Sequence, residues 1–170
     1  NSSVLVHEDR VIAIHGKENI DTSDVGRMVA VKRGAQPEAG AAGPVVLDQT
    51  SELWREPLVM FTSSPVLVEG RVYQVTHTGE LVCVDANTGK ILWQQKLGNG
   101  QLHASPLYAE GRLYVPMADG TFYILKLNDD GVEVIDEDML QGACLGAPTA
   151  WNGKLYVHTQ DKLYCWGKSG

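Results

Sequence analysis

Residues 64–73 read SPVLVEGRVY and residues 105–114 read SPLYAEGRLY, so one ten-residue pattern occurs twice at a spacing of 41. A weaker copy, APTAWNGKLY, covers residues 147–156. The N-terminus supplies a degraded fourth copy, SVLVHEDRVI, over residues 3–12, and an insertion of about twenty residues separates it from the next copy. A pattern that recurs at a fixed spacing of about forty residues predicts a repeat protein, whose units bury their faces only against each other.

Each copy predicts the same series of short strands. An apolar strand is followed by Glu-Gly or Asn-Gly, the residue pairs that favour a two-residue hairpin turn. Second strands are expected at 72–76, 113–117 and 155–159, and third strands at 81–84, 122–125 and 163–166. Fourth strands are expected to end at Trp54, Trp93 and Ile135. Four short antiparallel strands per unit, without helical periodicity, indicate a propeller blade rather than a sandwich.

The sequence therefore predicts an all-β fold of about four propeller blades of four antiparallel strands. Blade 1 is expected at about 1–54 with an inserted loop at 34–50, blade 2 at about 61–93, blade 3 at about 102–135 and blade 4 at about 144–167 without an outer strand. Because an unpaired strand edge invites aggregation, we expect the C-terminal half of a seven- or eight-bladed propeller. The remaining half, or a second copy of the chain, is the expected partner.

Composition narrows the classes of partner. The 170 residues are 44% hydrophobic and 21% charged, with a net charge of −7 and no basic stripe, so nucleic acid is not an expected partner. No apolar run has the length of a membrane span. The three cysteines have no metal-site spacing and are expected to be small buried hydrophobic residues: Cys83, Cys144 and Cys165.

The stretch CVDANTGKILW, residues 83–93, combines two strands with a tight turn. Asp85 can accept hydrogen bonds from the backbone two and three residues further on, and Gly89 can supply the positive φ that closes the turn. Trp93 then projects a large ring from the outer strand toward the neighbouring blade. We therefore interpret this stretch as a structural contact between blades, not as a reaction centre.

These residues resemble the PQQ-like (pyrroloquinoline-quinone-like) β-propeller repeats, whose blades carry a tryptophan-docking motif, Ala-x-Asp-x-x-Thr-Gly-x-x-x-Trp. The matching positions are Cys83 in place of alanine, Asp85, Thr88, Gly89 and Trp93, and Trp54 is the corresponding ring of blade 1. The Ser-Pro pairs at 64–65 and 105–106 match the family's inner-strand starts as well. Blade 3 departs from the motif, because Ile135 is expected at the tryptophan position.

The resemblance implies several possible functions. PQQ-like repeats occur in quinoprotein dehydrogenases, in an outer-membrane assembly lipoprotein, in sensor domains and in uncharacterised secreted bacterial proteins. The text VGRMVAV at 25–31, followed by a long insert to Trp54, resembles the last group most. A periplasmic or extracellular location is therefore expected.

Cofactor binding in the quinoprotein enzymes implies adjacent cysteines, a calcium site and a tryptophan beneath the quinone. The chain has no Cys-Cys pair, and Trp151 is either a pocket residue or ordinary core or channel lining. The acidic loop at 16–26 offers weak calcium ligands, namely Glu18, Asn19, Asp21 and Asp24. Their spacing differs from that of an EF-hand, and a solvated hairpin is the alternative interpretation.

Thr62, His103 and Leu145 occupy the same position in their repeat copies, three residues before the repeat proline. Inner strands begin there, near the mouth of a propeller channel, so Thr62 and His103 are pocket candidates. A hydrogen-bonded surface histidine is the alternative interpretation. The sequence contains no nucleophile elbow and no phosphate-binding loop.

The leading functional hypothesis is a non-catalytic scaffold that binds proteins or a small ligand and needs no cofactor. The alternative is a fragment of a PQQ- and calcium-dependent dehydrogenase that oxidises an alcohol or a sugar. A third hypothesis, the sensor domain of a membrane kinase, requires flanking segments that lie outside this sequence.

Overall fold

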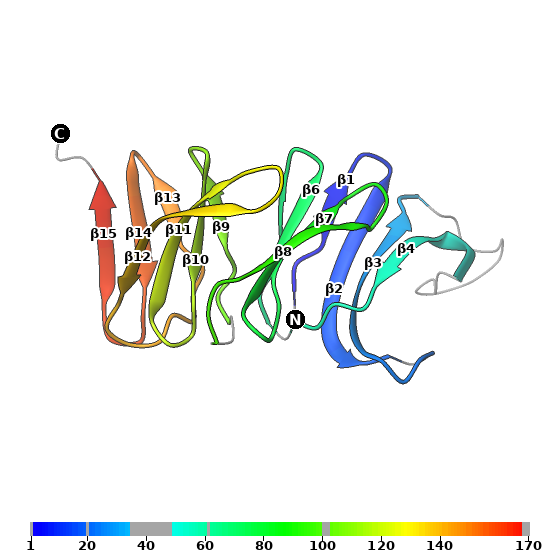
Figure 1. The fold of residues 1–170 in the computed structure, drawn as a ribbon, viewed down its shortest axis with the longest axis horizontal. Coiled ribbons are helices and arrows are strands. Elements are labelled where there is room, and N and C mark those ends of the chain that lie inside the picture. Colours follow the sequence, from blue (N-terminus) through cyan, green and yellow to red (C-terminus); the bar gives the residue numbers. More distant parts are fainter. Residues whose placement is uncertain (1, 20, 35–48, 61, 100–102, 168–170) are drawn as a thin grey trace.

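The repeat copies form a row of separate antiparallel sheets. The computed structural model describes residues 2–19, 21–34, 49–60, 62–99 and 103–167, and these residues form three four-stranded sheets and one three-stranded sheet. The strands of each sheet follow chain order. The first and last sheets lie at opposite ends of the long axis (Figure 1). An all-β row of up-and-down blades is the architecture expected from the sequence.

Each sheet corresponds to one repeat copy. Blade 1 contains β1 (Leu5–His7), β2 (Arg10–Glu18), β3 (Val25–Lys32) and β4 (Glu52–Glu56), with the short helix η1 (Gln49–Ser51) before β4. Blade 2 contains β5 (Val66–Val68), β6 (Arg71–Val75), β7 (Glu80–Asp85) and β8 (Ile91–Lys96). Blade 3 contains β9 (Leu107–Ala109), β10 (Arg112–Pro116), β11 (Thr121–Leu127) and β12 (Val132–Met139). Blade 4 contains β13 (Thr149–Trp151), β14 (Lys154–His158) and β15 (Leu163–Gly167).

The first hairpin of every blade has the predicted two-residue turn. In blade 2, Val68 pairs with Arg71, so Glu69 and Gly70 form the loop, with φ values of 49° and 76°. Two consecutive positive φ values define the turn type that fits the right-handed twist of the flanking strands. The corresponding turns of the other blades also place a non-glycine residue at positive φ, namely Glu8, Glu110 and Asn152.

Apolar side chains are buried between blades. We call the face that a blade turns to the next blade its trailing face, and the opposite one its leading face. Between blades 1 and 2 the core contains Ile12 and Met28 from one side and Val72 and Val84 from the other. The next core joins the trailing face of blade 2 to the leading face of blade 3, with Val75, Cys83, Leu113 and Leu125 among its members. The last joins Phe122 to Val157 and Trp166. Each blade therefore depends on its neighbours for its core.

The tryptophan-docking contact joins blade 1 to the β7–β8 turn of blade 2. The Trp54 indole Nε1 donates a hydrogen bond of 3.1 Å to the carbonyl oxygen of Ala86. Its ring lies directly over Gly89, where an added Cβ would meet Trp54 Cδ2 at 2.6 Å. The turn itself is held by Asp85, which accepts hydrogen bonds from the Asn87 and Thr88 backbone and from the Thr88 hydroxyl. The Asp85–Gly89 turn thus forms a platform for the ring of the preceding blade.

The ring of Trp93 in blade 2 packs against blade 3 as predicted, but its indole N–H makes no hydrogen bond there. The ring packs in the second core, with its centroid 5.9 Å from that of Tyr73. Its Nε1 is buried and has no hydrogen-bond partner among the described residues. The β11–β12 turn of blade 3, residues 128–131, reads Asn-Asp-Asp-Gly and lacks the motif of the β7–β8 turn. Burial raises the pKa of the Tyr73 phenol to about 12.

The strand register corrects the expected tryptophan position in blade 3. A β-bulge lies at the same place in the outer pair of blades 1, 2 and 3, and it pairs Trp54 with Ala30, Trp93 with Cys83 and Asp136 with Ile124. Asp136 therefore occupies the tryptophan position, and the prediction of Ile135 was wrong. Ile135 is the extra residue of the bulge, which a count along the sequence does not locate. The outer strands also extend beyond their predicted ends.

The repeated serines join the starts of neighbouring inner strands. The backbone N–H of Ser3 donates to Ser64 Oγ at 2.9 Å, and the backbone N–H of Ser64 donates to Ser105 Oγ at 2.8 Å. The next copy has Ala147 at this position and therefore no hydroxyl acceptor. The Ser of each Ser-Pro pair thus links successive blades at one end of the inner strands.

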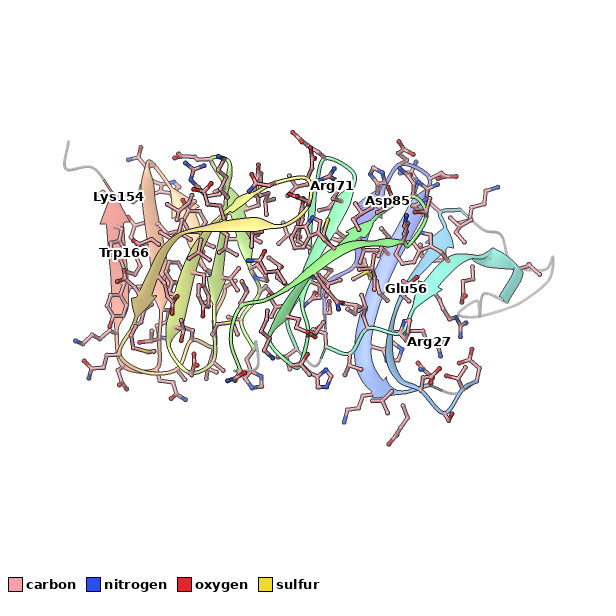
Figure 2. All side chains as sticks on the ribbon, in the orientation of Figure 1. Arg27, Glu56, Arg71, Asp85, Lys154 and Trp166 are labelled. Atoms are coloured by element: carbon pink, nitrogen blue, oxygen red, sulfur yellow. The ribbon has the colours of Figure 1, made fainter. Side chains whose placement is uncertain are left out.

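The repeated arginines join blades at the other end of the inner strands. Arg71 reaches the β11–β12 turn of blade 3 and forms an ion pair of 2.9 Å with Asp129 (Figure 2). Arg10 of blade 1 makes the equivalent contact with blade 2, where it donates a hydrogen bond to the side chain of Asn87. Arg10 and Arg71 therefore contact the following blade, whereas Arg112 donates to the Gly111 carbonyl oxygen within its own turn.

Two matched glycine substitutions test the docking contact. Gly111→Ala places a side chain at positive φ with no atom within 4 Å, so we expect it to lower the free energy of unfolding by about 1–2 kcal/mol. Gly89→Ala has the same backbone cost and also collides with Trp54, so we expect a further loss of about 1–3 kcal/mol. Urea unfolding of both variants measures the difference. Equal losses in the free energy of unfolding would show that the ring of Trp54 is not in close contact with this turn.

Candidate functional site

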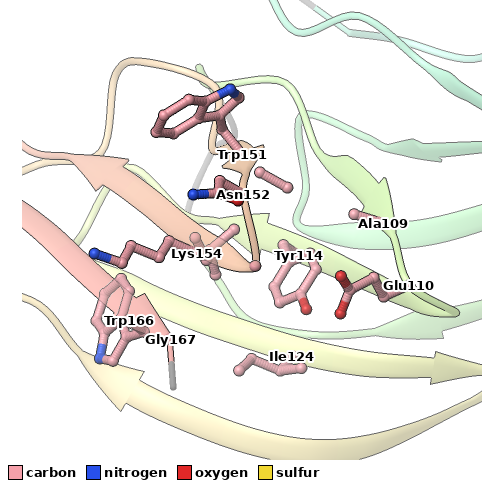
Figure 3. Close-up of a pocket in the computed structure, with 12 residues that line it drawn as sticks. Ala109, Glu110, Tyr114, Ile124, Trp151, Asn152, Lys154, Trp166 and Gly167 are labelled. Atoms are coloured by element: carbon pink, nitrogen blue, oxygen red, sulfur yellow. The ribbon is translucent and has the colours of Figure 1, made fainter. Parts of the chain in front are cut away.

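A cleft lies between blades 3 and 4, at the hairpin ends of their inner strands (Figure 3). Its volume is about 330 Å³. Blade 3 and blade 4 both contribute side chains to it, principally Glu110, Tyr114, Ile124, Trp151, Lys154 and Trp166. The cleft is thus an inter-blade site, and the turns of two successive hairpins form its rim.

One wall of the cleft belongs to a ladder of aromatic rings. Phe122 stacks on Trp166 with centroids 5.7 Å apart and ring planes 2° apart. Tyr114 stacks on Phe122 at 6.3 Å, and Tyr164 stacks on Trp166 at 5.3 Å. These rings come from neighbouring strands of both blades, so packing fixes their orientation. Such a wall suits a flat apolar or aromatic group.

The cleft also has a charged residue on each side. Glu110 lies in the β9–β10 turn and Lys154 begins β14, and both line the cleft beside the aromatic wall (Figure 3). Apolar walls with a few polar groups are typical of sites that bind a small group with a defined orientation.

Trp151 lies at the rim of this cleft and is 67% exposed. It ends the inner strand β13, immediately before the Asn152–Gly153 turn. Neither of the two alternatives proposed from the sequence describes this environment fully: the ring lines a cleft, but it is not enclosed as a floor beneath a bound ring would be.

Thr62 and His103 are brought together by the fold. Thr62 Oγ1 lies 3.2 Å from His103 Nδ1, and it also contacts the His103 carbonyl oxygen at 3.3 Å. Both residues are exposed or half-exposed and precede the inner strands β5 and β9. Trp151 is the last residue of the inner strand β13 and so lies at the opposite end of its strand. The structure therefore separates this pair from the cleft and makes the third pocket candidate part of a different surface.

The acidic loop of blade 1 is organised around arginine. The Asp21 carboxylate accepts hydrogen bonds from Arg27 and Arg55, which hold the pKa of Asp21 far below its usual range. Asn19 Oδ1 accepts a hydrogen bond of 2.6 Å from Arg27 Nε. Two of the four weak calcium candidates thus already face guanidinium groups. In the ranges that the structure describes, no three His, Cys, Asp or Glu side chains gather as a metal site.

A second cleft, between blades 2 and 3, shows that the site is a feature of the repeat. Glu69 and Tyr73 line it at the positions that Glu110 and Tyr114 have in the next blade. Here the ion pair from Arg71 to the β11–β12 turn crosses the rim. Trp151 was named from the sequence, but the other cleft residues were not predicted, although the shared phase of Tyr73 and Tyr114 was a signal.

The cysteines differ in their surroundings. Cys83 and Cys144 are buried, and burial raises the pKa of both thiols. Cys165 is exposed, so the prediction that all three are buried was wrong for this residue. It has the register position of Cys83, since Cys165 pairs with Tyr156 as Cys83 pairs with Tyr73. None of the described residues covers the trailing face of blade 4, whereas blade 3 covers Cys83.

The described part of the chain contains no helix with the length and hydropathy of a membrane span.

The row of blades, the docking turn and the tryptophan positions define a PQQ-like β-propeller repeat protein. A family profile described as outer membrane protein assembly factor BamB matches residues 41–135, more than half of the sequence. The chain belongs to the family of the outer membrane protein assembly factor BamB.

Curated bacterial relatives agree with this family. The BamB protein of Salmonella typhimurium is 29% identical over 160 residues, which cover 91% of this chain and 36% of the relative. That of Yersinia pestis is 26% identical over 139 residues, which cover 75% of this chain and 34% of the relative. The chain thus spans about a third of the length of these relatives.

Solved structures support the fold. BamB from Moraxella catarrhalis superposes with a TM-score of 0.68 at 18% identity, over 98% of this chain and 43% of that one. A europium-containing methanol dehydrogenase superposes with a TM-score of 0.53 at 14% identity, over 83% of this chain and 24% of that one. At these identities, the likeness concerns the propeller fold alone.

Thiol alkylation tests the placement of the cysteines. Iodoacetamide should label the folded 170-residue chain once, at Cys165, because the other two thiols are buried and resist ionisation. Peptide mass spectrometry locates the label, and urea should expose the remaining two sites. Cys165→Ser is the control and should leave the native protein unlabelled. Rapid native labelling of Cys83 would contradict the packing between blades 2 and 3.

Proposed function

We propose that this chain is part of a non-catalytic scaffold that binds other proteins in the bacterial cell envelope, during the assembly of outer membrane proteins. The observation that carries the proposal is the family match over residues 41–135, whose relatives are described as outer membrane protein assembly factors. A periplasmic position within the envelope is part of the proposal, because assembly factors act beside the membrane that they serve.

The geometry of the repeat supports a scaffold. The polar side chains that recur at fixed phase are used to hold blades together: Ser64 links two inner strands, Arg71 crosses to the next blade and Asp85 holds the docking turn. What is left for function is surface between blades, such as the cleft beside Trp166. Rigid platforms with binding surfaces at the ends of their blades are a common use of repeat folds.

The alternative function, a PQQ-dependent dehydrogenase, does not fit the described residues. The aromatic residue proposed to lie beneath a quinone, Trp151, is at an open rim. The carboxylate of the calcium candidate Asp21 is paired with two arginines. PQQ and calcium together would need a flat enclosed floor and free carboxylates at one place. We therefore propose a function that uses no PQQ.

Addition of PQQ and calcium to the full-length protein tests this proposal. We expect no quinone absorbance to remain with the protein after gel filtration and no rise in its melting temperature, because among the described residues Trp151 lies at an open rim and Asp21 is paired with two arginines. A retained quinone band, together with dye-linked oxidation of an alcohol or a sugar, would overturn it.

Deletion of the full-length gene tests the scaffold role. In the bacterium that carries it, loss of the protein should lower the outer membrane content of β-barrel proteins severalfold, as measured by quantitative mass spectrometry of membrane fractions. Wild-type protein supplied in trans should restore their levels. In vivo crosslinking of a tagged copy should recover components of the machinery that assembles outer membrane proteins.

Two controls make the result interpretable. Inner membrane proteins measured in the same cells should not change, because the proposal concerns outer membrane assembly alone. Unchanged outer membrane proteins in the deletion strain, with no crosslinked assembly component, would contradict the proposed function.

A further inference from the structure

The outer strand of blade 3, β12, has a free edge. It is the last strand of its sheet, and no described strand pairs with its other side. Seven of its eight residues are exposed, and it is longer than the outer strands β4 and β8, which have five and six residues. A free strand edge presents unpaired N–H and C=O groups that can pair with another chain.

The hydrogen bonds of the neighbouring strand show which groups of β12 point outward. The Thr121 N–H donates to an aspartate side chain of the β10–β11 turn, and the Thr121 carbonyl oxygen accepts from the Met117 N–H. Thr121 is the register partner of Met139, so Met139 directs its own N–H and C=O away from the sheet. Glu137 lies two residues earlier and has the same orientation, and its N–H donates to the exposed Asp136 carboxylate.

Contacts with the rest of the protein hold both ends of β12. At its start, the Val132 N–H donates a hydrogen bond of 3.1 Å to Gln95 Oε1 of blade 2, toward which the β11–β12 hairpin extends (Figure 1). Just after its end, the Leu140 N–H donates to the Gly120 carbonyl oxygen at 2.9 Å, and the Leu140 side chain is buried in the core between blades 3 and 4. An edge that is fixed in advance loses less conformational entropy when a strand is added to it.

The segment that contains β12 carries most of the unbalanced charge of the chain. Residues 127–153 contain six of the 21 Asp and Glu residues and none of the 14 Lys and Arg residues, and the net charge is −7. Among the described residues, only one of the four carboxylates of β12 has an ion-pair partner, namely Glu133 with Lys126 at 3.5 Å. A second copy of this strand would place like charges opposite each other, whereas a basic strand would be attracted.

The register of β12 defines the pattern of a complementary strand. Asp136 and Asp138 pair with Ile124 and Phe122, so the two carboxylates share one face of the sheet. Residues directly opposite each other on one face of a sheet stabilise the pairing when their charges are opposite. A strand added to this edge therefore gains most from Lys or Arg at alternate positions.

We propose that the free edge of β12 pairs with an extended segment of a partner polypeptide that carries Lys or Arg at alternate positions. Backbone hydrogen bonds to Glu137 and Met139 hold the added strand, and Asp136 and Asp138 select its basic side chains. The inference deepens the proposed function, on which it rests, by naming the kind of polypeptide that the scaffold would bind. The binding itself can be measured without any assay of membrane protein assembly.

Fluorescence anisotropy with the full-length protein tests the backbone and the charge separately. The labelled probes are three capped peptides: Lys-Val-Lys-Val-Lys, Lys-Pro-Lys-Pro-Lys and Glu-Val-Glu-Val-Glu. We expect the Kd of Lys-Val-Lys-Val-Lys to be at least fivefold lower than that of either control, because proline removes backbone donors and glutamate is repelled by the carboxylates of β12. Bound Lys-Val-Lys-Val-Lys should also slow amide hydrogen exchange at residues 132–139, as measured by mass spectrometry.

Matched double variants locate the binding at the outward backbone groups. Glu137→Pro with Met139→Pro removes two outward N–H groups and leaves the ladder with β11 in place, since proline is tolerated on strand edges. Glu137→Ala with Met139→Ala removes the same side chains and keeps both N–H groups. We expect the proline variant to weaken binding of Lys-Val-Lys-Val-Lys at least tenfold, and the alanine variant to stay within threefold of wild type.

Two results would overturn the proposal. One is equal affinity of the wild-type protein for Lys-Val-Lys-Val-Lys and either control peptide, a comparison that needs no variant to fold. The other is a proline variant that has wild-type circular dichroism and binds Lys-Val-Lys-Val-Lys as strongly as the alanine variant does. A normal outer membrane in the deletion strain, by contrast, would contradict the proposed function and leave the peptide result standing.

Discussion

The structure depends on the burial of each blade face by the blade beside it. A four-stranded sheet of this size has two apolar faces and no core of its own, so the free energy of folding comes from the junctions. Trp54 on the Gly89 turn is the most complete of these contacts, because the ring is buried and its N–H donates to the Ala86 carbonyl oxygen. The serine and arginine links then join the two ends of the first two junctions.

The same contact is not made at every junction. A junction without the docking ring keeps its walls, because those walls are also the faces of two blades. At the third junction the aromatic ladder of Tyr114 and Trp166 remains in place, while Asp136 is turned to solvent.

The sequence was sufficient for the parts of the fold that repeat. Fixed spacing identified the blades, Glu-Gly turns identified the hairpins, and Asp85 with Gly89 identified the docking turn, since each follows from local chemistry. It was insufficient where geometry between strands decides: the bulge moved the tryptophan position to Asp136. Apart from Trp151, the cleft residues were not predicted for the same reason, because they are far apart in the chain and are brought together by the stacking of blades 3 and 4.

The buried indole of Trp93 has a consequence for the stability of its junction. Its N–H lost its water on folding and found no acceptor among the described residues, a cost of about 1–3 kcal/mol that Trp54 does not bear. The junction between blades 2 and 3 therefore bears a desolvation cost in its own packing that the junction between blades 1 and 2 does not.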